Sequence, residues 1–290
     1  MGIIRIDENN LWKYGDYIEP DAAEELKRYY HRGVVITDED SLPLGYAVWE
    51  YRHMETEEPL EAHICYFFAE DNEAADALIS SYTELIRDDG AVKSFFRLPI
   101  NDMEKYKGCF ERAGFRVSVA EGEYLRLTIR DFLSLPFLSE CKREKVKALN
   151  QIKLRFFRQE MCSFASVANS DLLSELKYLP FNWYELDISC FSVSHGRPDG
   201  FMLVHELPSG SLHVEILRPV THNLESLINL MGFCMNESVK KYSEDTEVIM
   251  RKNDQFSVML ANYLFPDKKQ EKVLYGEYSH LLLFRGTQPG

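Results

Sequence analysis

Phe110-Glu111-Arg112-Ala113-Gly114-Phe115 closes an amphipathic segment that begins near Glu104. Glycine takes the left-handed backbone conformation in which helices commonly end. The stretch therefore predicts a helix over residues 104–113 that stops at Gly114. A weaker copy, Leu260-Ala261-Asn262-Tyr263-Leu264-Phe265, follows about 150 residues later. Two such endings in a chain of 290 residues predict two tandem domains of the same kind.

Hydrophobic periodicity and turn residues predict one order of elements in both halves. That order is a helix, three strands, a helix, a strand, a helix and a strand. In the first half these are residues 19–33, 34–37, 45–50, 64–68, 71–90, 92–98, 104–113 and 124–129. In the second half they are residues 172–178, 189–193, 200–205, 212–217, 223–235, 247–250, 254–264 and a strand within 273–283. The predicted boundaries are a first domain over 1–130, a connector over 131–160 and a second domain over 161–290.

The Phe110–Phe115 stretch, read with this element order, resembles the aromatic-Glu-Lys/Arg-x-Gly-Phe signature that closes the last helix of the GNAT superfamily. The members of this superfamily are acyl-CoA-dependent N-acyltransferases. The resemblance implies an α/β fold with α+β character: two tandem GNAT-like domains, each a mixed, partly antiparallel sheet with helices on both faces. It covers most of both halves as a pattern of elements, but only a few residues as a motif.

The bulk properties indicate a globular protein of the cytoplasm. Hydrophobic residues make up 45% of the chain, and no apolar stretch approaches the roughly 20 residues that span a bilayer. The six cysteines are scattered without a Cys-x-x-Cys pair. That pattern fits a reducing compartment and argues against a zinc site or a disulfide framework. No membrane partner and no metal are expected, and the oligomeric state is left open.

The charge is uneven along the chain. Residues 1–130 hold 15 Lys and Arg against 27 Asp and Glu, a net charge of −12, whereas residues 131–290 hold 18 against 20, a net of −2. An acidic half disfavours DNA, whose phosphates need cationic partners. It would attract a cationic acceptor such as a small amine or a basic peptide, although charge of this kind also serves solubility alone.

The predicted connector is basic. Its cations are Lys142, Arg143, Lys145, Lys147, Lys153, Arg155 and Arg158, with Glu144 as the acid among them. Such a run predicts either a segment that contacts phosphates or a partner, or a solvated helical connector between domains.

The GNAT resemblance implies that the loop after the fourth strand wraps the pyrophosphate of acyl-CoA through the pattern Gln/Arg-x-x-Gly-x-Gly/Ala. Neither half has these glycines. The first loop, Ala69-Glu70-Asp71-Asn72-Glu73, carries three carboxylates, which should repel a diphosphate. The first domain is therefore not expected to bind CoA in the usual way.

The second loop, Arg218-Pro219-Val220-Thr221-His222-Asn223, has no acid. Arg218, Thr221 and His222 could donate to phosphates, and the helix that Asn223 begins offers uncapped N–H groups. Asn253 matches a family asparagine that precedes the last helix and contacts the cofactor. The second domain is thus the better candidate for acetyl-CoA, although the loop could equally be an ordinary strand-to-helix connection.

Candidate catalytic residues come from the same comparison. Glu215 lies in the predicted fourth strand of the second half, where family members often carry the general base; alternatively it faces solvent on an alternating strand. The family acid is often a tyrosine at the aromatic place of the signature, but that place holds Phe110 and Leu260 here. Tyr263 or Tyr106 could substitute, or could belong to the core.

Three functions stay open on the sequence. The leading one is an acetyltransferase that moves an acetyl group from acetyl-CoA to an amine, with Glu215 and Tyr263 as base and acid. The missing glycines and the missing signature tyrosine favour a non-catalytic tandem module that binds a small molecule or a protein. The basic connector supports a tRNA-dependent aminoacyltransferase of the same fold. A strand bulge together with an open cleft beside Glu215 would favour the first function.

Overall fold

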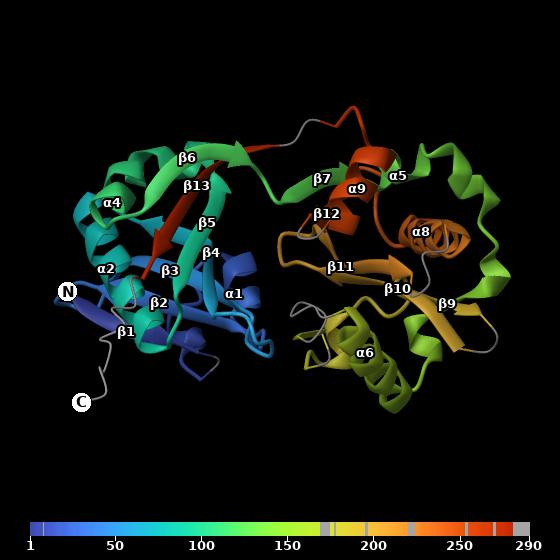
Figure 1. Cartoon of the computed structure of the whole chain (residues 1–290), viewed down its shortest axis with the longest axis horizontal. Coiled ribbons are helices and arrows are strands. Elements are labelled where there is room, and N and C mark those ends of the chain that lie inside the picture. The colour runs from blue at the N-terminus through green and yellow to red at the C-terminus, as the bar shows by residue number, and fades with distance from the viewer. Residues whose placement is uncertain are drawn as a thin grey trace, which may run out of the picture. The chain divides into compact units, whose positions relative to one another are not determined.

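The computed structural model divides the chain into two compact units, shown in Figure 1. The first unit comprises Met1–Gly122 and Lys272–Gly290, and the second comprises Glu123–Glu271. The structure describes residues 1–7, 9–168, 175–176, 178–194, 197–219, 224–252, 255–268 and 271–280, without the side chains of 164–168, 197 and 255.

The first unit is built on a seven-stranded mixed sheet in the order β1-β2-β3-β4-β5-β13-β6. The pairing is antiparallel except between β4 and β5, which run parallel. Its strands are β1 (Gly2–Ile6), β2 (His31–Thr37), β3 (Pro43–Arg52), β4 (Glu61–Ala69), β5 (Lys93–Pro99), β6 (Arg116–Glu121) and β13 (Lys272–Ser279). Its helices are α1 (Pro20–Glu25), α2 (Asn72–Asp88), α3 (Ile100–Met103) and α4 (Lys107–Arg112), with 3₁₀ turns at Leu11–Lys13 and Glu104–Tyr106.

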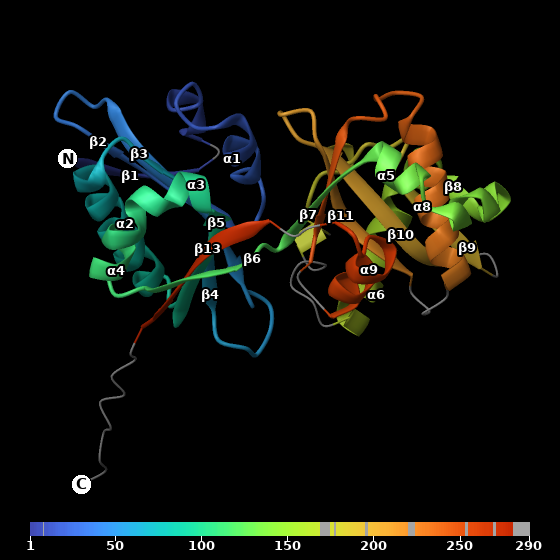
Figure 2. The same cartoon turned by 90° about the horizontal axis from the view of Figure 1, so that it is seen from above.

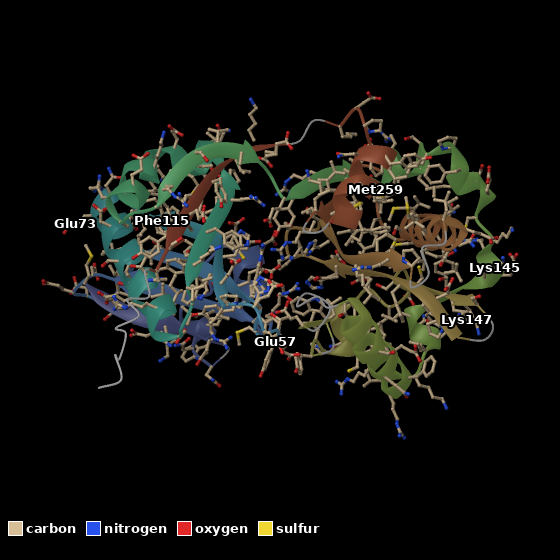
Figure 3. The ribbon with its side chains drawn as sticks, viewed as in Figure 1. Glu57, Glu73, Phe115, Lys145, Lys147 and Met259 are labelled. Atoms are coloured by element: carbon tan, nitrogen blue, oxygen red, sulfur yellow. The ribbon has the colours of Figure 1, made fainter. Side chains whose placement is uncertain are left out.

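Both faces of this sheet are covered by helices, as Figure 2 shows. Helices α2 and α4 close the larger core on one face, and α1 packs over the other. The signature stretch belongs to the larger core. Phe110 is fully buried with its ring 4.4 Å from that of Phe96, and Figure 3 shows Phe115 within the same unit. Gly114 has φ of +94°, so it ends the helix in the left-handed conformation as predicted.

The second unit is built on a six-stranded mixed sheet in the order β7-β12-β11-β10-β9-β8. Only β11 and β12 pair in parallel. Its strands are β7 (Tyr124–Thr128), β8 (Val146–Ala148), β9 (Cys190–Ser194), β10 (Arg197–Glu206), β11 (Leu212–Pro219) and β12 (Glu247–Arg251). Its helices are α5 (Ile129–Leu133), α6 (Leu154–Ala168), α8 (Leu224–Ser238) and α9 (Gln255–Leu264), with 3₁₀ turns at Pro136–Glu140, Arg143–Lys145, Leu149–Gln151 and Phe181–Trp183.

Two hydrophobic clusters fill the faces of the second sheet. The larger one joins α5, α8 and α9 to the sheet, and includes Leu212, Val214 and Leu217 of β11. The smaller one lies on the opposite face, where Phe157 of α6 and Trp183 pack with Ile216 of β11. Within the described part of the chain, no helix has the length and hydropathy needed to cross a bilayer.

The two units exchange their last strands, and this corrects the predicted boundaries of 1–130 and 161–290. The strand at 124–129, expected to finish the first sheet, is β7 and pairs with β12 of the second. The strand expected to finish the second sheet is β13, which pairs with β5 and β6 of the first. Gly276 fits this place closely, because a Cβ there would lie 2.1 Å from the Phe96 ring. The Arg116–Glu121 strand was also missed by the sequence analysis.

The basic segment over 131–160 is part of the second unit rather than a connector between domains. Its β8 pairs with β9, and three of its cations bind acids on α8. Lys142 and Lys145 contact Glu225 at 2.6 and 2.9 Å, and Arg143 contacts Glu237. Figure 3 shows Lys145 and Lys147 at the surface of this unit. These contacts with α8 pair part of the positive charge of the segment with acids of the same unit.

The start of α5 offers a test of how charge supports this unit. The Thr128 amide donates to Asp131 Oδ2 at 2.8 Å, and the Asp131 amide donates to Thr128 Oγ1 at 3.2 Å. Burial raises the pKa of Asp131, but hydrogen bonds from Lys268 and Thr128 outweigh it, and the net pKa lies below its ordinary value. The stabilisation is therefore present above the unfolded pKa of about 3.9 and is lost as the pH falls through the folded value.

Asp131→Ala is expected to lower the free energy of unfolding by about 1 kcal/mol near neutral pH, the size of a helix-cap effect. The difference in unfolding free energy between the variant and the unchanged protein should narrow in acid, where the carboxylate of the unchanged protein is protonated. Urea denaturation at two pH values measures both. Asp245→Ala is the control, because that side chain is 70% exposed in its pair with Arg130 and should cost little. A gap that widens in acid would contradict this assignment.

Candidate functional site

The central parallel pair of strands separates at the same place in both sheets. In the second unit, β11 pairs with β12 from Leu212 to Val214, although β11 continues to Pro219. In the first unit, β4 pairs with β5 from Glu61 to Ile64, although β4 continues to Ala69. Beyond these points each longer strand presents backbone groups along the edge that faces away from its antiparallel partner, so these edges are candidate binding sites.

A β-bulge marks each separation point. The register between β10 and β11 passes from Leu203↔Ile216 to Val204↔Val214, which leaves Glu215 as the extra residue. The register between β3 and β4 passes from Val48↔Tyr66 to Trp49↔Ile64, which leaves Cys65 as the extra residue. Bulges re-aim side chains and occur often beside active sites. Glu215 and Cys65 therefore hold equivalent positions in the two repeats.

One glycine in each repeat allows the same close approach between two antiparallel strands, β3 and β4 in the first unit and β10 and β11 in the second. Gly45 pairs with Ala69, and a Cβ on it would lie 2.8 Å from the carbonyl oxygen of Phe68. Gly200 pairs with Pro219, and a Cβ on it would lie 2.8 Å from the Pro219 Cα. Backbone approaches this close exclude any side chain. The shared glycine and the shared bulge show the duplication that the repeated element order predicted.

Glu215 is buried, so the alternative of a solvent-facing carboxylate is wrong. The residue is 4% exposed. Its Oε1 accepts a hydrogen bond from Trp183 Nε1 at 3.2 Å and lies 3.7 Å from His213 Nδ1. Leu212 and Val214 face the larger cluster, so alternation puts Glu215 on the opposite face, where Trp183 and the smaller cluster cover it. The bulge then brings Ile216 to the same face as Glu215. Alternation alone could not show that this second face is covered.

The Trp183 side chain, which donates to Glu215, is itself held in place by its neighbours. Trp183 ends the 3₁₀ turn Phe181–Trp183 and stacks on His205, with ring centroids 4.1 Å apart and planes 13° from parallel. His205 Nδ1 lies 2.6 Å from the carbonyl oxygen of Trp183. The carboxylate, indole and imidazole thus form one buried polar group at the bulge. A carboxylate held in this way beside an open strand edge is suited to accept a proton from a bound substrate.

The predicted cofactor loop is described in part. Arg218 lies at the end of β11, opposite Phe201 of β10, and its side chain is half-buried. Thr221, His222 and Asn223 lie outside the described residues, and so does Asn253. The first described residue after the loop is Leu224, where α8 begins.

The equivalent loop of the first unit has its own anion at the helix start. Asp71 caps α2, and its Oδ1 accepts the Ala74 amide at 2.8 Å. This is one of the N–H groups that would otherwise face a phosphate. Together with Glu70 and Glu73, the cap supports the expectation that this loop does not hold a diphosphate.

Neither tyrosine considered as an acid lies in a position like that of Glu215. Tyr106 is buried in the core and its hydroxyl donates to the carbonyl oxygen of Ala69, which is a structural role. Tyr263 is 73% exposed on α9, one turn after the exposed Met259 that Figure 3 labels. Its neighbours Leu260 and Leu264 turn into the core instead.

A second polar cluster, at the bulge of the first unit, was missed by the sequence analysis. His31 of β2, Glu50 of β3 and Cys65 of β4 offer ligand atoms that all lie within 4.8 Å of one another. His63 joins them, with Nδ1 3.0 Å from Glu50 Oε1. These residues lie far apart in the sequence, so no local motif signals them. The pair His63-x-Cys65 on one strand was the single available sign.

The ionisation of this cluster is coupled. Burial and the charge of Glu50 raise the pKa of the Cys65 thiol, but hydrogen bonds with His31 and His63 lower it, and the net pKa lies below its ordinary value. Burial and Arg52 lower the pKa of His63, but hydrogen bonds with Cys65 and Glu50 outweigh them and raise it. The cluster therefore favours thiolate character at Cys65.

Solved structures match the tandem arrangement over nearly the whole chain. A tandem GNAT protein from the clavulanic acid biosynthesis pathway matches with a TM-score of 0.63 at 9% identity, over 96% of this chain and 98% of that one. A GCN5-related N-acetyltransferase from Kribbella flavida matches with a TM-score of 0.50 at 14% identity, over 96% and 72%. The sequence itself matches no protein-family model and no curated protein.

A third match is the glucosamine N-acetyltransferase region of a fungal multi-domain GH3 β-N-acetylglucosaminidase. Its TM-score is 0.60 at 10% identity over 96% of this chain, which spans 38% of the length of that protein. Identities this low carry the fold alone. The matched arrangement, the two bulged sheets and the paired glycines agree with one another. The chain is a tandem GNAT-fold protein of the α/β class.

Proposed function

We propose that this protein is an N-acyltransferase, and that its second unit moves an acyl group, acetyl in the simplest case, from acyl-CoA to an amine. The observation that carries the proposal is Glu215, a buried carboxylate at the bulge where β11 leaves β12. The GNAT resemblance puts the pantetheine arm between two such separated strands. The base and the thioester would then meet at one strand edge.

The chemistry is a direct transfer. Glu215 takes a proton from the acceptor ammonium, and the neutral amine attacks the thioester carbonyl. The tetrahedral intermediate then releases the CoA thiolate, and the second proton that leaves the nitrogen as the amide forms passes through solvent to this thiolate. Because Tyr263 is 73% exposed, the proposal assigns it no part in this step. Positioning the two substrates supplies the remaining acceleration.

The cofactor contacts belong to the same proposal. Arg218, Thr221, His222 and Asn223 would bind the pyrophosphate together with the start of α8, and Asn253 would bind the arm of acetyl-CoA. Helix starts favour phosphate because their N–H groups point at the anion. The first unit would not bind CoA through its loop, since Asp71 already caps α2.

The acceptor is proposed to be a cationic amine, either a small molecule or a basic peptide. The net charge of −12 over residues 1–130 would attract such a molecule. The described cysteines are free thiols, which suits a reducing compartment such as the cytoplasm. For the tRNA-dependent alternative, the support has weakened, because Lys142, Arg143 and Lys145 bind acids of their own unit.

Calorimetric titration with acetyl-CoA tests the proposal. We expect binding in the micromolar range, about −8 kcal/mol, and at least tenfold weaker binding for Arg218→Ala. Arg126→Ala is the matched control, because this arginine of β7 pairs with Glu247 at the surface of the same unit. Absence of binding up to about millimolar acetyl-CoA, weaker than about −4 kcal/mol, would favour the non-catalytic module instead.

A further inference from the structure

The bulge of the first unit carries different chemistry from that of the second. Cys65 occupies the position that Glu215 holds in the second repeat, and it lies among His31 and Glu50 instead of beside an indole. Three adjacent strands, β2, β3 and β4, each contribute one of these side chains. His31 and Glu50 are directly paired across β2 and β3, so the backbone fixes their separation.

We propose that His31, Glu50 and Cys65 form a site for Zn²⁺ in the first unit. A thiolate, an imidazole and a carboxylate are the three donor types that zinc takes in proteins. The mixture of a soft sulfur with nitrogen and oxygen favours zinc over magnesium or calcium, which take oxygen ligands. Three protein ligands leave the fourth position of a tetrahedral ion for water or another small ligand.

The distances allow such a site after a small contraction. Zinc bonds of about 2.0–2.3 Å place tetrahedral ligand atoms about 3.3–3.6 Å apart. The three ligand atoms now lie within 4.8 Å of one another, and Glu50 Oε2 is 4.0 Å from His31 Nε2. Closing this gap needs side-chain movement of about 1 Å and no change in strand pairing. His31 and Glu50 are buried, so the ion would be removed from bulk water.

The surroundings of the three ligands are partly built for the ion. Glu25 Oε2 lies 3.1 Å from His31 Nε2, the same nitrogen that faces Glu50, so Glu25 would have to turn away from this nitrogen for the ion to bind. The other oxygen of Glu50, Oε1, accepts from Arg52 Nε at 2.7 Å and contacts His63 Nδ1 at 3.0 Å. One oxygen of Glu50 is thereby held by its neighbours while the second faces His31.

A metal here would tie three neighbouring strands together. The carboxylate of Glu50 and the thiolate of Cys65 would each bring a negative charge to the ion, while Arg52 stays paired with the other oxygen of Glu50. The repeat in which Asp71 caps α2 would then use its bulge for stability or for a metal-bound ligand. The site is independent of acyl transfer in the second unit.

Cobalt substitution tests the site directly. The full-length protein is reduced, stripped with a chelator and titrated with Co²⁺, whose thiolate complexes absorb in the near ultraviolet by charge transfer. We expect one equivalent of Co²⁺ to give this band, one equivalent of Zn²⁺ to remove it, and Zn²⁺ to raise the melting temperature. Cys65→Ser should abolish the band and weaken Zn²⁺ binding by at least about 100-fold.

Two further variants guard the interpretation. Cys162→Ser replaces an exposed thiol of α6 and should leave the band and the zinc affinity unchanged. Glu50→Gln keeps the size of the side chain but removes its charge, so it should keep the cobalt band and weaken zinc binding. The proposal is overturned if the unchanged protein shows no thiolate band, or if Cys65→Ser binds Zn²⁺ as tightly as its parent.

Discussion

Replacing Glu215 by Gln is expected to lower kcat for acyl transfer to an amine by about 10²–10⁴-fold, the range of a lost general base. The amide keeps the size of the side chain and can still accept the hydrogen bond of Trp183, so the buried cluster should stay intact. The affinity for acetyl-CoA should change less than about threefold, because the carboxylate meets the acceptor rather than the cofactor. Steady-state kinetics with a panel of amines and calorimetry measure the two quantities.

Glu247→Gln is the matched control for this experiment. Glu247 is also a strand carboxylate of the second unit, but it pairs with Arg126 at the surface, and its loss should leave kcat unchanged. A general base also affects the pH dependence of the rate. In the parent, the rate should decrease as the pH falls below the pKa of the base, and in Glu215→Gln this decrease should be absent. Equal rates for the parent and Glu215→Gln would remove Glu215 from the chemistry.

The fold was open to prediction because its signals are local. Gly114 ends a helix through its own backbone freedom, and Phe110 before this end and Phe115 after it pack their rings together in the core. The repeated order of elements followed from periodicity in the same way. Gly45 and Gly200 stand at the start of two equivalent predicted strands. In the structure, the backbone of the neighbouring strand comes equally close to both. Residue types that act through their own φ and size can be interpreted without a structure.

The site was open to prediction only in part, because bulges and pairings are not local. Glu215 was a candidate through resemblance, but its burial depends on the Trp183 side chain that covers that face of β11, and Trp183 comes from a distant part of the sequence. The Cys65 cluster depends on the register of three strands, so residues 31, 50 and 65 meet although nothing in the spacing joins them. Tyr263, the predicted acid, is 73% exposed because the phase of α9 turns it outward beside Met259.

A chain that ends before Lys272 is expected to lose the fold of the first unit and to keep that of the second. Strand β13 lies between β5 and β6, pairing through seven residues with the first and through six with the second. Its removal leaves β6 at a distance from the rest of the sheet and β5 paired with β4 alone, and it exposes the core that Val273 and Leu274 close. At about 0.5–1.5 kcal/mol net for each hydrogen bond, the lost ladders alone are comparable with the about 5–15 kcal/mol that stabilise a domain.

Hydrogen exchange distinguishes the two units in one experiment. In the chain truncated after Glu271, amides of β2 to β5 should exchange freely, whereas amides of β9 to β12 should keep their protection. A chain that stops after His280 is the control, because it retains all of β13 and the bond from the His280 amide to the Val92 carbonyl oxygen. The order of elements along the sequence predicts the reverse, with β13 completing the second sheet. Loss of protection in β9 to β12 with β2 to β5 intact would therefore restore the boundaries of 1–130 and 161–290 and reject the strand exchange.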